Sequence, residues 1–389
     1  MKAVFPEAYR ESLPYRHRLD IAEALALFCE QSGRDLPWRK NKTPYRVYVS
    51  EVMLQQTRTE TVLRYYEPFL IAYPTVTALA DADGDALRKQ WEGLGYYRRI
   101  ALAQKACLDI KKRYGGEIPA DYAALRALPG FGDYTASAVA SFAFGLRAAA
   151  VDGNLLRVLA RLFAFEGNIL EAKNAALLRA VAEEMLPPPK HGSRSERKGG
   201  ALHEKDGGAA ATWNQAMMEL GAQVCLPNTQ PHCHACPLSP YCLACAGGCA
   251  DALPVRESGT KRRHEEKTVL RIKSGNRYLI RRRPDTGLLA GFYELPTADG
   301  TIGTDGLSKI LQALGIFSAF TAEPLPAAKH VFTHITWHMT GYEITLAEEI
   351  VPPQGMLFAS LNELNEVHPI PSAFRAYRPT AKGNERHES

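Results

Sequence analysis

Apolar residues in the first half of the chain recur at the spacing of amphipathic helices. Residues 100–114 show this clearly, with an apolar side chain at every third or fourth position and a glycine pair directly afterwards. The same spacing continues from Ile21 to about Leu186 with short connections, and no alternating strand pattern interrupts it. The sequence therefore predicts an all-α N-terminal half.

The pattern changes twice after Leu186. Residues 187–211 are rich in proline, glycine and charge and have no apolar periodicity, which predicts a flexible surface insertion. Helical spacing returns at Trp213. Beyond residue 251, β-branched and aromatic residues alternate with polar ones, and one helix-like segment lies at 307–314. We expect an α+β domain that starts near residue 260.

Composition narrows this picture only slightly. The 389 residues are 46% hydrophobic and 23% charged, as in ordinary globular proteins. No apolar run approaches the length of about 20 residues that spans a bilayer, and Met1 to Arg18 has no apolar signal-peptide core. We expect a soluble, cytoplasmic protein with no membrane partner. The net charge of +5 is compatible with nucleic-acid binding.

Six of the eight cysteines crowd into residues 225–249. Disulfide scaffolds belong mostly to small secreted domains, so this clustering favours a metal centre. Zinc, which often uses two paired C-x2-C knuckles, is one candidate, although this window contains a single knuckle. The clustered residues are Cys225, Cys233, Cys236, Cys242, Cys245 and Cys249.

Leu128 to Gly132 (LPGFG) reads as a tight turn, and a helix rich in small residues follows it. Gly130 and Gly132 permit positive φ and a close backbone approach, and the first N–H groups of the next helix are free to bind an anion. Such a turn can hold a DNA phosphate without reading sequence. The alternative is a simple helix–helix turn with capping glycines.

Glu51 lies within a predicted helix at residues 45–56. No lysine or arginine occurs three or four positions away, so no surface ion pair is available to it on the helix. A desolvated carboxyl there would have a raised pKa and could act as a general acid. The alternative is a glutamate that reaches solvent at the edge of the helix. The neighbouring positions hold Val47, Tyr48, Leu54 and Gln55.

Two of these motifs together resemble a known family. Asp152 stands twenty residues after the glycine turn, as in the helix-hairpin-helix DNA glycosylase superfamily that includes endonuclease III. The segment from Leu36 to Thr57, in its TPY…SEVMLQQT run, resembles the catalytic helix of MutY-type adenine glycosylases. The resemblance implies an all-α glycosylase core in two lobes with DNA bound between them.

The resemblance also implies catalytic roles. Glu51 would protonate adenine, and Asp152 would stabilise the positive charge that develops on the sugar. Tyr134 stands where strand-cutting relatives have a lysine, and a phenol cannot form their Schiff base; a monofunctional enzyme is implied. From spacing alone, Asp152 could equally be a helix cap.

Substrate contacts follow from the same resemblance, although core packing is the alternative for Trp38, Leu54 and Tyr96. The adenine pocket would contain Trp38, Arg39, Leu54 and Gln215. The DNA-binding residues would be Gln56, Thr57, Tyr96, Gly130, Gly132 and Asn154.

The cysteine spacing is close to the pattern that holds a [4Fe–4S] cluster in this superfamily. The implied ligands are Cys225, Cys233, Cys236 and Cys242. The first loop is one residue longer than the usual pattern, and Cys245 or Cys249 could replace a ligand or remain as a spare thiol.

The C-terminal segment RRRP…GLLAGFYELP, residues 281–296, resembles the Nudix-like domain appended to MutY-type enzymes. The carboxylate-rich helix that a Nudix hydrolase needs is missing after Glu294, so a recognition module is implied rather than pyrophosphate hydrolysis. Phe332, Thr333 and His334 match the family's Phe-Ser-His loop, which reads the oxidised guanine, with threonine in place of serine.

We therefore expect a multidomain protein with an all-α helix-hairpin-helix core and an α+β Nudix-like domain. The core would span residues 20–250, with a six-helix lobe at 35–147 and an iron–sulfur lobe at 20–34 and 148–250. A linker at 251–265 would lead to the recognition domain at 266–379.

The expected function is hydrolytic removal of adenine mispaired with 8-oxoguanine or guanine in double-stranded DNA, by a monomeric, nucleoid-associated enzyme. The alternatives are a glycosylase of other mismatch specificity and a non-enzymatic iron–sulfur DNA-binding protein.

Overall fold

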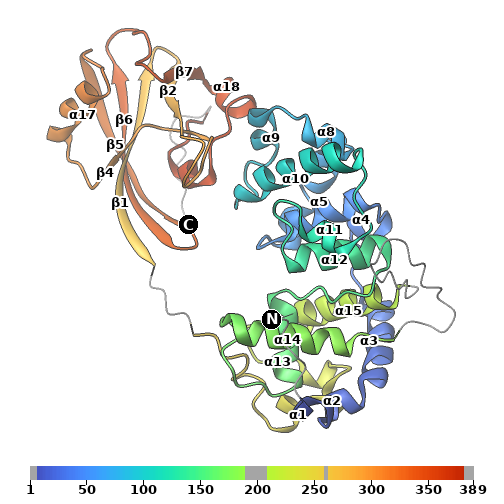
Figure 1. Cartoon of the computed structure of the whole chain (residues 1–389). Coiled ribbons are helices and arrows are strands. Elements are labelled where there is room, and N and C mark those ends of the chain that lie inside the picture. The colour runs from blue at the N-terminus through green and yellow to red at the C-terminus, as the bar shows by residue number, and fades with distance from the viewer. Residues whose placement is uncertain (1–6, 189–207, 258–261, 381–389) are drawn as a thin grey trace. The chain divides into compact units, whose positions relative to one another are not determined.

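The structure, a computed structural model, describes residues 7–188, 208–257 and 262–380. Most of the insertion predicted at 187–211 lies outside these residues. Within the described residues, no helix is both long enough and apolar enough to cross a membrane. The chain divides into two compact units (Figure 1): unit 1 contains Met1–Asp81 and Ala101–Ser258, and unit 2 contains Ala82–Ile100 and Gly259–Ser389.

Helices and no strands are assigned to the described residues of unit 1, which confirms the all-α prediction. Two 3-10 turns, at Cys233–Ala235 and Ser239–Tyr241, interrupt its last loops. Helix α10 (Arg98–Tyr114) begins in unit 2 and continues into unit 1. The other helices of unit 1 are α1 (Glu7–Arg10), α2 (Leu13–Arg16), α3 (Arg18–Ser32), α4 (Pro37–Lys40), α5 (Pro44–Leu54), α6 (Thr59–Val62), α7 (Tyr66–Ala72), α8 (Val76–Ala80), α11 (Tyr122–Arg126), α12 (Asp133–Phe144), α13 (Gly153–Leu162), α14 (Ala172–Met185), α15 (Ala209–Gln223) and α16 (Leu243–Ala246).

Local sequence signals explain where the site-bearing helices begin. Helix α5 starts at Pro44, a residue suited to the first helical turn, and the Thr43 hydroxyl accepts a hydrogen bond from the Arg46 N–H at 3.3 Å. Helix α13 starts directly after Asp152, whose side chain caps it by accepting from the Leu155 N–H at 2.8 Å. The capping role considered for Asp152 is therefore present.

The predicted glycine turn precedes α12, but its two glycines differ. Gly130 has a φ of +75°, in the region that favours glycine, and an added Cβ there would lie 2.9 Å from the Leu102 Cβ. Gly132, the N-cap residue of α12, has a φ of −72°. Of the two glycines, which both permit positive φ, only Gly130 uses it, because Gly132 is a helix N-cap and adopts an extended conformation.

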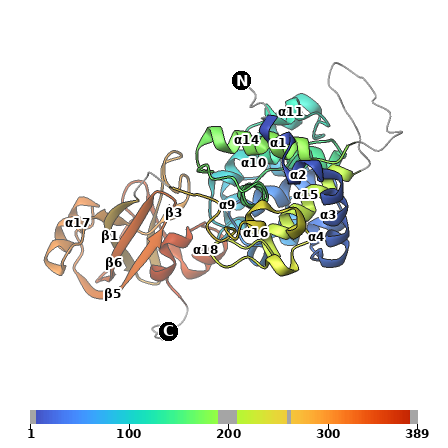
Figure 2. The same ribbon diagram turned by 90° about the horizontal axis from the view of Figure 1, so that it is seen from below.

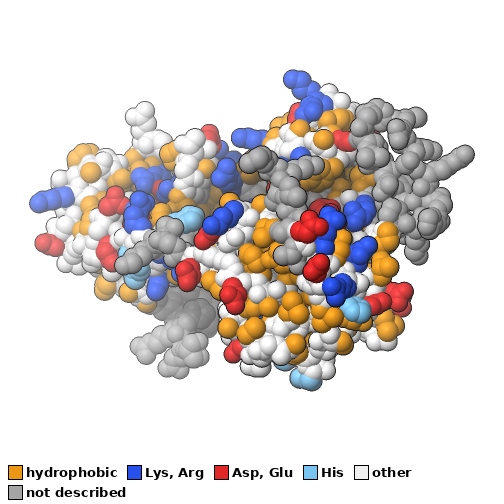
Figure 3. Space-filling view, turned by 60° about the horizontal axis from the view of Figure 1, so that its bottom comes forward, with side chains coloured by type: hydrophobic (Ala, Val, Ile, Leu, Met, Phe, Trp, Pro, Cys, Tyr) orange, Lys and Arg blue, Asp and Glu red, His pale blue; other side chains and the backbone are white. Residues whose placement is uncertain are grey.

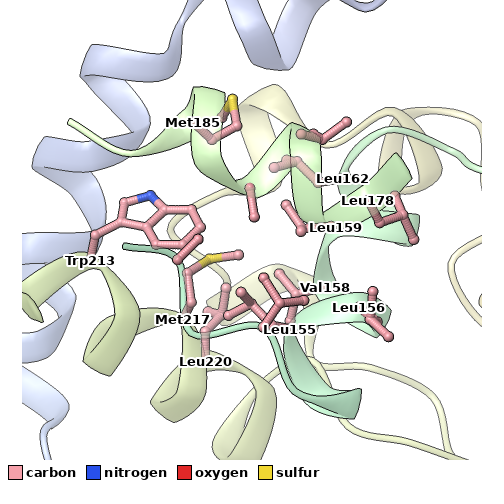
Figure 4. Close-up of a cluster of buried hydrophobic side chains, with 14 of the residues drawn as sticks. Leu155, Leu156, Val158, Leu159, Leu162, Leu178, Met185, Trp213, Met217 and Leu220 are labelled. Atoms are coloured by element: carbon pink, nitrogen blue, oxygen red, sulfur yellow. The ribbon is translucent and has the colours of Figure 1, made fainter. Parts of the chain in front are cut away.

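Helices α13, α14 and α15 bury the main apolar core of unit 1. Figure 4 shows Trp213, Met217 and Leu220 of α15 facing the leucine-rich side of α13. Leu155 and Leu159 are fully buried there, one turn apart on that side. The shared core fixes α13, and with it Asp152, relative to α15.

The buried Asn214 side chain links α15 by hydrogen bonds to the segment that leads to Asp152. Its side chain is fully buried, and its amide N–H groups donate to the Ala148 carbonyl at 2.8 Å and the Ser141 hydroxyl at 3.0 Å. Its side-chain oxygen accepts from the Ala150 N–H at 2.9 Å. These bonds satisfy backbone groups that would otherwise be buried without partners.

Unit 2 contains a seven-stranded sheet in which the main path of neighbours is β3-β2-β1-β6-β5. Strand β4 pairs with β1 and β7 pairs with β2; β1 and β6 are parallel, and the other pairs are antiparallel. The strands are β1 (Arg263–Ser274), β2 (Arg277–Arg282), β3 (Tyr293–Glu294), β4 (Thr297–Asp299), β5 (Phe320–Val331), β6 (Ile335–Leu346) and β7 (Met356–Ser360).

Successive side chains along the strands point to opposite faces of the sheet, and both faces are buried. Val269 of β1 belongs to the cluster that contains Leu364 of α18 (Leu361–Glu366), whereas the adjacent Leu270 belongs to the cluster that contains Leu307 and Leu311 of α17 (Leu307–Ala313). The α+β prediction is confirmed, and the helix expected near 307–314 is α17; helix α18 was not expected.

Residues 82–100, with helix α9 (Gly84–Gln90), belong to unit 2 although they are distant in sequence from its sheet. The Tyr97 ring lies 4.1 Å, between centroids, from the Phe292 ring, and the Tyr97 hydroxyl accepts from the Ser372 N–H at 3.4 Å. Nothing in the hydrophobic pattern predicted this association.

Replacing Asn214 by leucine should destabilise unit 1 by about 2–4 kcal/mol, since it leaves the Ala148 carbonyl and Ala150 N–H buried without partners. The measurement is the shift of the urea midpoint. The exposed Asn41→Ala variant is the control and should leave the midpoint unchanged. Equal midpoints for Asn214→Leu and wild type would contradict a stabilising role for this amide.

Candidate active site

Most of the predicted substrate residues line one cavity in unit 1. The cavity has a volume of about 210 Å³ and lies among α4, α5, α12, α13 and α15. The predicted residues that line it are Trp38, Arg39, Glu51, Leu54, Thr57, Tyr134, Asp152, Asn154 and Gln215. Sequence positions that are far apart therefore converge on one space.

Glu51 is the buried acid of this cavity. It is only 5% exposed, and burial raises the pKa of its carboxyl to about 7. The Tyr134 hydroxyl donates a hydrogen bond to the Glu51 Oε2 at 2.5 Å, which opposes part of that rise, while the nearby Asp152 adds to it. The alternative of a glutamate that reaches solvent is wrong. At neutral pH this carboxyl exists in both protonated and ionised forms.

Asp152 combines two roles in its geometry. One carboxylate oxygen caps α13, and the other accepts from the Asn154 side-chain amide at 2.8 Å. Burial raises the pKa of Asp152, and the hydrogen bonds from Leu155 and Asn154 counteract this. The carboxylate is thus held in a fixed position on the cavity wall, near Glu51.

The sequence analysis missed a buried ion cluster in the cavity lining. The Glu219 side chain is fully buried; it accepts two hydrogen bonds from the Arg34 guanidinium, at 2.8 and 2.9 Å, and one from Arg39. Burial alone would raise the pKa of Glu219, but these hydrogen bonds hold it below its ordinary value. The signal that could have found Glu219 is its spacing, one helical turn after Gln215 on α15.

Gln215 and Trp38 complete the lining. The Gln215 side-chain oxygen lies 3.5 Å from the Lys42 ammonium, and its amide lies 3.4 Å from the Cys29 sulfur. Trp38 is mostly buried and packs edge-on against the Tyr66 ring, with a centroid distance of 5.4 Å. Trp38 therefore belongs to the core and also to the cavity wall.

The predicted DNA-backbone residues lie outside this cavity, with the exception of Thr57 and Asn154. Gln56 is exposed and has a φ of +56°, a strained conformation for a residue other than glycine. Gly130 and Gly132 form the turn before α12, where the Arg126 guanidinium donates to the Phe131 carbonyl at 2.6 Å. These groups remain candidates for contact with DNA.

Unit 2 carries the two remaining predicted elements. Tyr96 is 47% exposed and has a φ of +48° between Gly95 and Tyr97. Behind it, the buried Arg99 guanidinium donates to the carbonyls of Leu94 and Gly95 at 3.2 and 3.0 Å. Burial lowers the pKa of Arg99 to about 10. The sequence analysis missed this arginine, which stabilises the loop that exposes Tyr96.

The predicted recognition trio forms the turn between β5 and β6. Thr333 and His334 are exposed, and Phe332 is half-buried, with its ring 5.0 Å from the Trp337 ring between centroids. The Phe332 N–H donates to the Ile335 carbonyl at 2.8 Å and closes the turn. The trio thus presents two polar side chains from a fixed base.

Five of the six clustered cysteines line a second, small cavity beside α13. Arg161 of α13 donates to the Cys225 sulfur at 3.2 Å, and the Arg161 carbonyl accepts from the Cys242 thiol at 3.4 Å. All eight cysteines are described, and none forms a disulfide. The segment that carries the cluster lies at the periphery of unit 1 (Figure 2). The lining cysteines are Cys225, Cys233, Cys236, Cys242 and Cys245.

Among the described residues, no three cysteine, histidine or carboxylate side chains converge tightly enough for a single metal ion. Several thiols around one apolar cavity, with an arginine at its edge, form the donor set of an iron–sulfur cluster, which needs its ligands further apart than one zinc ion does. The residues present therefore fit such a cluster.

Comparisons with known proteins agree with this geometry. Residues 49–186 match the model of HhH-GPD superfamily base excision DNA repair proteins, and residues 268–378 match that of the NUDIX domain. The Homo sapiens protein named adenine DNA glycosylase is 31% identical over 408 residues, which cover 86% of this chain and 70% of the human protein. This chain belongs to the adenine DNA glycosylase family.

Other relatives extend the comparison. The Schizosaccharomyces pombe adenine DNA glycosylase is 28% identical over 430 residues, which cover 92% of this chain and 88% of the yeast protein. Among solved structures, a thermostable thymine-DNA glycosylase is 25% identical, with a TM-score of 0.49 over 60% of this chain and 98% of that one.

Charge alone does not mark a DNA-binding surface on the face of the glycosylase drawn in Figure 3. In Figure 3, lysine and arginine side chains lie among acidic and uncharged groups and do not cover one continuous surface. The net charge of +5 is correspondingly modest. Placement of the glycosylase site rests on the buried acid and its cavity.

Burial of Glu51 predicts a pH-dependent stability difference between the glycosylase and its Glu51→Gln variant. Because the folded-state pKa of about 7 exceeds the ordinary value of 4.5, the wild type loses stability as pH rises between these values. The variant should therefore gain up to about 3 kcal/mol relative to wild type by pH 8, with no such gain at pH 4.

Urea midpoints at pH 4, 6 and 8 measure this difference. Glu23→Gln, which changes an exposed glutamate of α3, is the matched control and should show no pH-dependent difference from wild type. A Glu51→Gln difference that stays constant with pH would show that the carboxyl is well solvated.

Proposed function

We propose that this adenine DNA glycosylase hydrolyses the N-glycosidic bond of adenine mispaired with 8-oxoguanine or guanine in duplex DNA, without cutting the strand. The observation that carries the proposal is the Glu51 carboxyl, buried between Tyr134 and Asp152 with a pKa of about 7. Family membership supplies base excision repair as the setting. We also propose that the enzyme acts as a monomer on chromosomal DNA in the cytoplasm.

The cavity can perform the reaction in two stages. In the first, protonated Glu51 gives its proton to a ring nitrogen of the flipped adenine, and the sugar–base bond breaks, with its electron pair leaving on adenine. Asp152, fixed by its two hydrogen bonds, stabilises the cationic sugar. In the second, water adds to the sugar carbon and gives a proton to the Glu51 carboxylate, which restores the acid.

The Tyr134 position supports hydrolysis over strand cutting. A lyase needs an amine that attacks the sugar carbon, and the pKa of the Tyr134 hydroxyl is raised well above its ordinary value by burial and by Glu51. The hydroxyl therefore stays protonated and donates to Glu51. We assign Tyr134 to holding the acid rather than to covalent catalysis.

Adenine selection is proposed to come from Trp38, Arg39, Leu54 and Gln215. Arg39 and Gln215 offer hydrogen-bonding groups to the purine edge, and Leu54 and Trp38 offer apolar surface to its face. The buried Glu219 holds Arg39 in place.

Recognition of the opposite base is proposed to lie in unit 2. The exposed Thr333 and His334 can hydrogen-bond an oxidised guanine, and the exposed Tyr96 can wedge into the opened stack. The threonine hydroxyl can make the contact that serine makes in related loops. Gln56, Thr57, Asn154 and the Gly130–Gly132 turn are proposed to contact the DNA strand itself.

We further propose that Cys225, Cys233, Cys236 and Cys242 hold a [4Fe–4S] cluster. When bound, the cluster would supply a structural cross-link that orders residues 225–249. The thiols around one cavity and the Arg161 guanidinium beside Cys225 support this assignment.

A labelled duplex with one adenine opposite 8-oxoguanine tests the activity. Strand breaks should appear mainly after alkali treatment, and Glu51→Gln should lower the rate of base release by about 10²–10⁴-fold, because the proton donor is lost. The wild-type rate should fall as pH rises above about 7, since the acid form is the active one. Glu23→Gln is the control. Equal breaks without alkali would establish a lyase, and base release unchanged by Glu51→Gln would remove Glu51 from the mechanism.

The paired variants Thr333→Ala and His334→Ala test recognition of the opposite base. Each should slow release of adenine opposite 8-oxoguanine by about tenfold, the effect of one hydrogen bond of about 1.4 kcal/mol, and leave release of adenine opposite guanine unchanged. The exposed Thr321→Ala on β5 is the control. An equal loss on both substrates would argue against a specific reading of 8-oxoguanine by this loop.

A further inference from the structure

The cavity proposed for the cluster has one thiol more than a four-ligand cluster needs. Cys245 lines it together with the four proposed ligands. It lies on the short helix α16, one turn after Cys242, which precedes that helix. Residues three apart on a helical turn face the same side, so both sulfurs are directed to the same space.

The sixth cysteine of the cluster differs from Cys245. Cys249 packs with an apolar group that contains Ala250, Leu253 and Val255, and its N–H donates to the Ala244 carbonyl at 2.9 Å. It is not among the residues that line the cysteine cavity. The chain therefore offers one extra thiol inside the cavity and one outside it, in the same loop.

Cys245 contacts two of the proposed ligands: its backbone N–H donates to the Cys242 sulfur, and its side chain contacts the Cys233 side chain. A hydrogen bond joins the two side chains. The other proposed ligands are held differently: Cys225 receives a hydrogen bond from Arg161, the Cys242 thiol donates to the Arg161 carbonyl, and the Cys236 sulfur accepts from the Leu238 N–H. Two adjacent thiols thus share one corner of the cavity.

The chain reaches this corner by two routes. Cys233 comes from the loop after Cys225, which has seven intervening residues, and it starts the 3-10 turn at Cys233–Ala235. Cys245 comes from α16. Because separate segments carry the two thiols, loss of one leaves the backbone of the other in place.

We propose that Cys245 is a fifth thiol of the cluster site and can replace Cys233 as the ligand of one iron. The inference rests on the proposed cluster. With a cluster bound, Cys245 would take the place of Cys233 at one iron, and the Cys245 proton would pass to the released Cys233 thiolate. No electron is transferred, and the charge of the site is unchanged.

Single and double alanine variants of the full-length protein, purified without oxygen, test this exchange. Alanine is chosen because a serine oxygen can itself bind iron. The readouts are iron per chain and visible absorbance at about 400 nm, neither of which depends on activity. Cys233→Ala and Cys245→Ala should each retain the cluster, and the double variant should lose it.

Two comparisons make the test specific. The proposal offers no replacement thiol for Cys236, so Cys236→Ala should lose the cluster as fully as the double variant. Cys249→Ala should match wild type. Circular dichroism distinguishes cluster loss from failure to fold.

Loss of iron from Cys233→Ala equal to that from Cys236→Ala would overturn the inference, as would a double variant that keeps its cluster. A colourless, iron-free wild type would instead refute the proposed cluster and remove the ground for this inference.

Discussion

Removal of Glu51 from water is the constraint on which the site depends. A carboxyl without solvent keeps its proton near neutral pH, but it is tolerated in a fold only if neighbouring groups limit the cost. Here Tyr134 supplies a hydrogen bond from α12. The helices that meet at this point must therefore keep their positions, and Asn214 and the α13–α15 core provide the necessary rigidity.

The cavity contains a second buried carboxylate with the opposite character. Glu219 is fully buried, as the side chain of Glu51 nearly is, yet two arginines keep it ionised. Two carboxyls whose environments shift their pKa values in opposite directions can have different functions. Glu51 is suited to proton transfer, and Glu219 is suited to holding Arg39. A change at Arg34 would consequently reach the substrate pocket through Glu219.

The sequence revealed those features that depend on neighbours along the chain. The lack of a cation one helical turn from Glu51, the Asp152 cap and the alternation at Val269 and Leu270 are local patterns, and the structure agrees with them. The resemblance to known glycosylases brought in Gln215 and Trp38, which carry little signal alone. Contacts between distant segments were not accessible. Arg34 contacts Glu219, 185 positions away, and Tyr97 contacts Phe292. Neither contact produces a periodic pattern in the sequence.

The discontinuous make-up of unit 2 has a consequence for synthesis on the ribosome. Residues 82–100 emerge long before the sheet against which Tyr97 packs, whereas N-terminal segments otherwise fold first as they appear. The loop that exposes Tyr96 therefore completes its packing only after translation has passed Phe292. A nascent or prematurely terminated chain that ends before the sheet can contain every residue of the cavity around Glu51. It would still present an incompletely packed Tyr96 loop, with apolar surface available to chaperones and proteases.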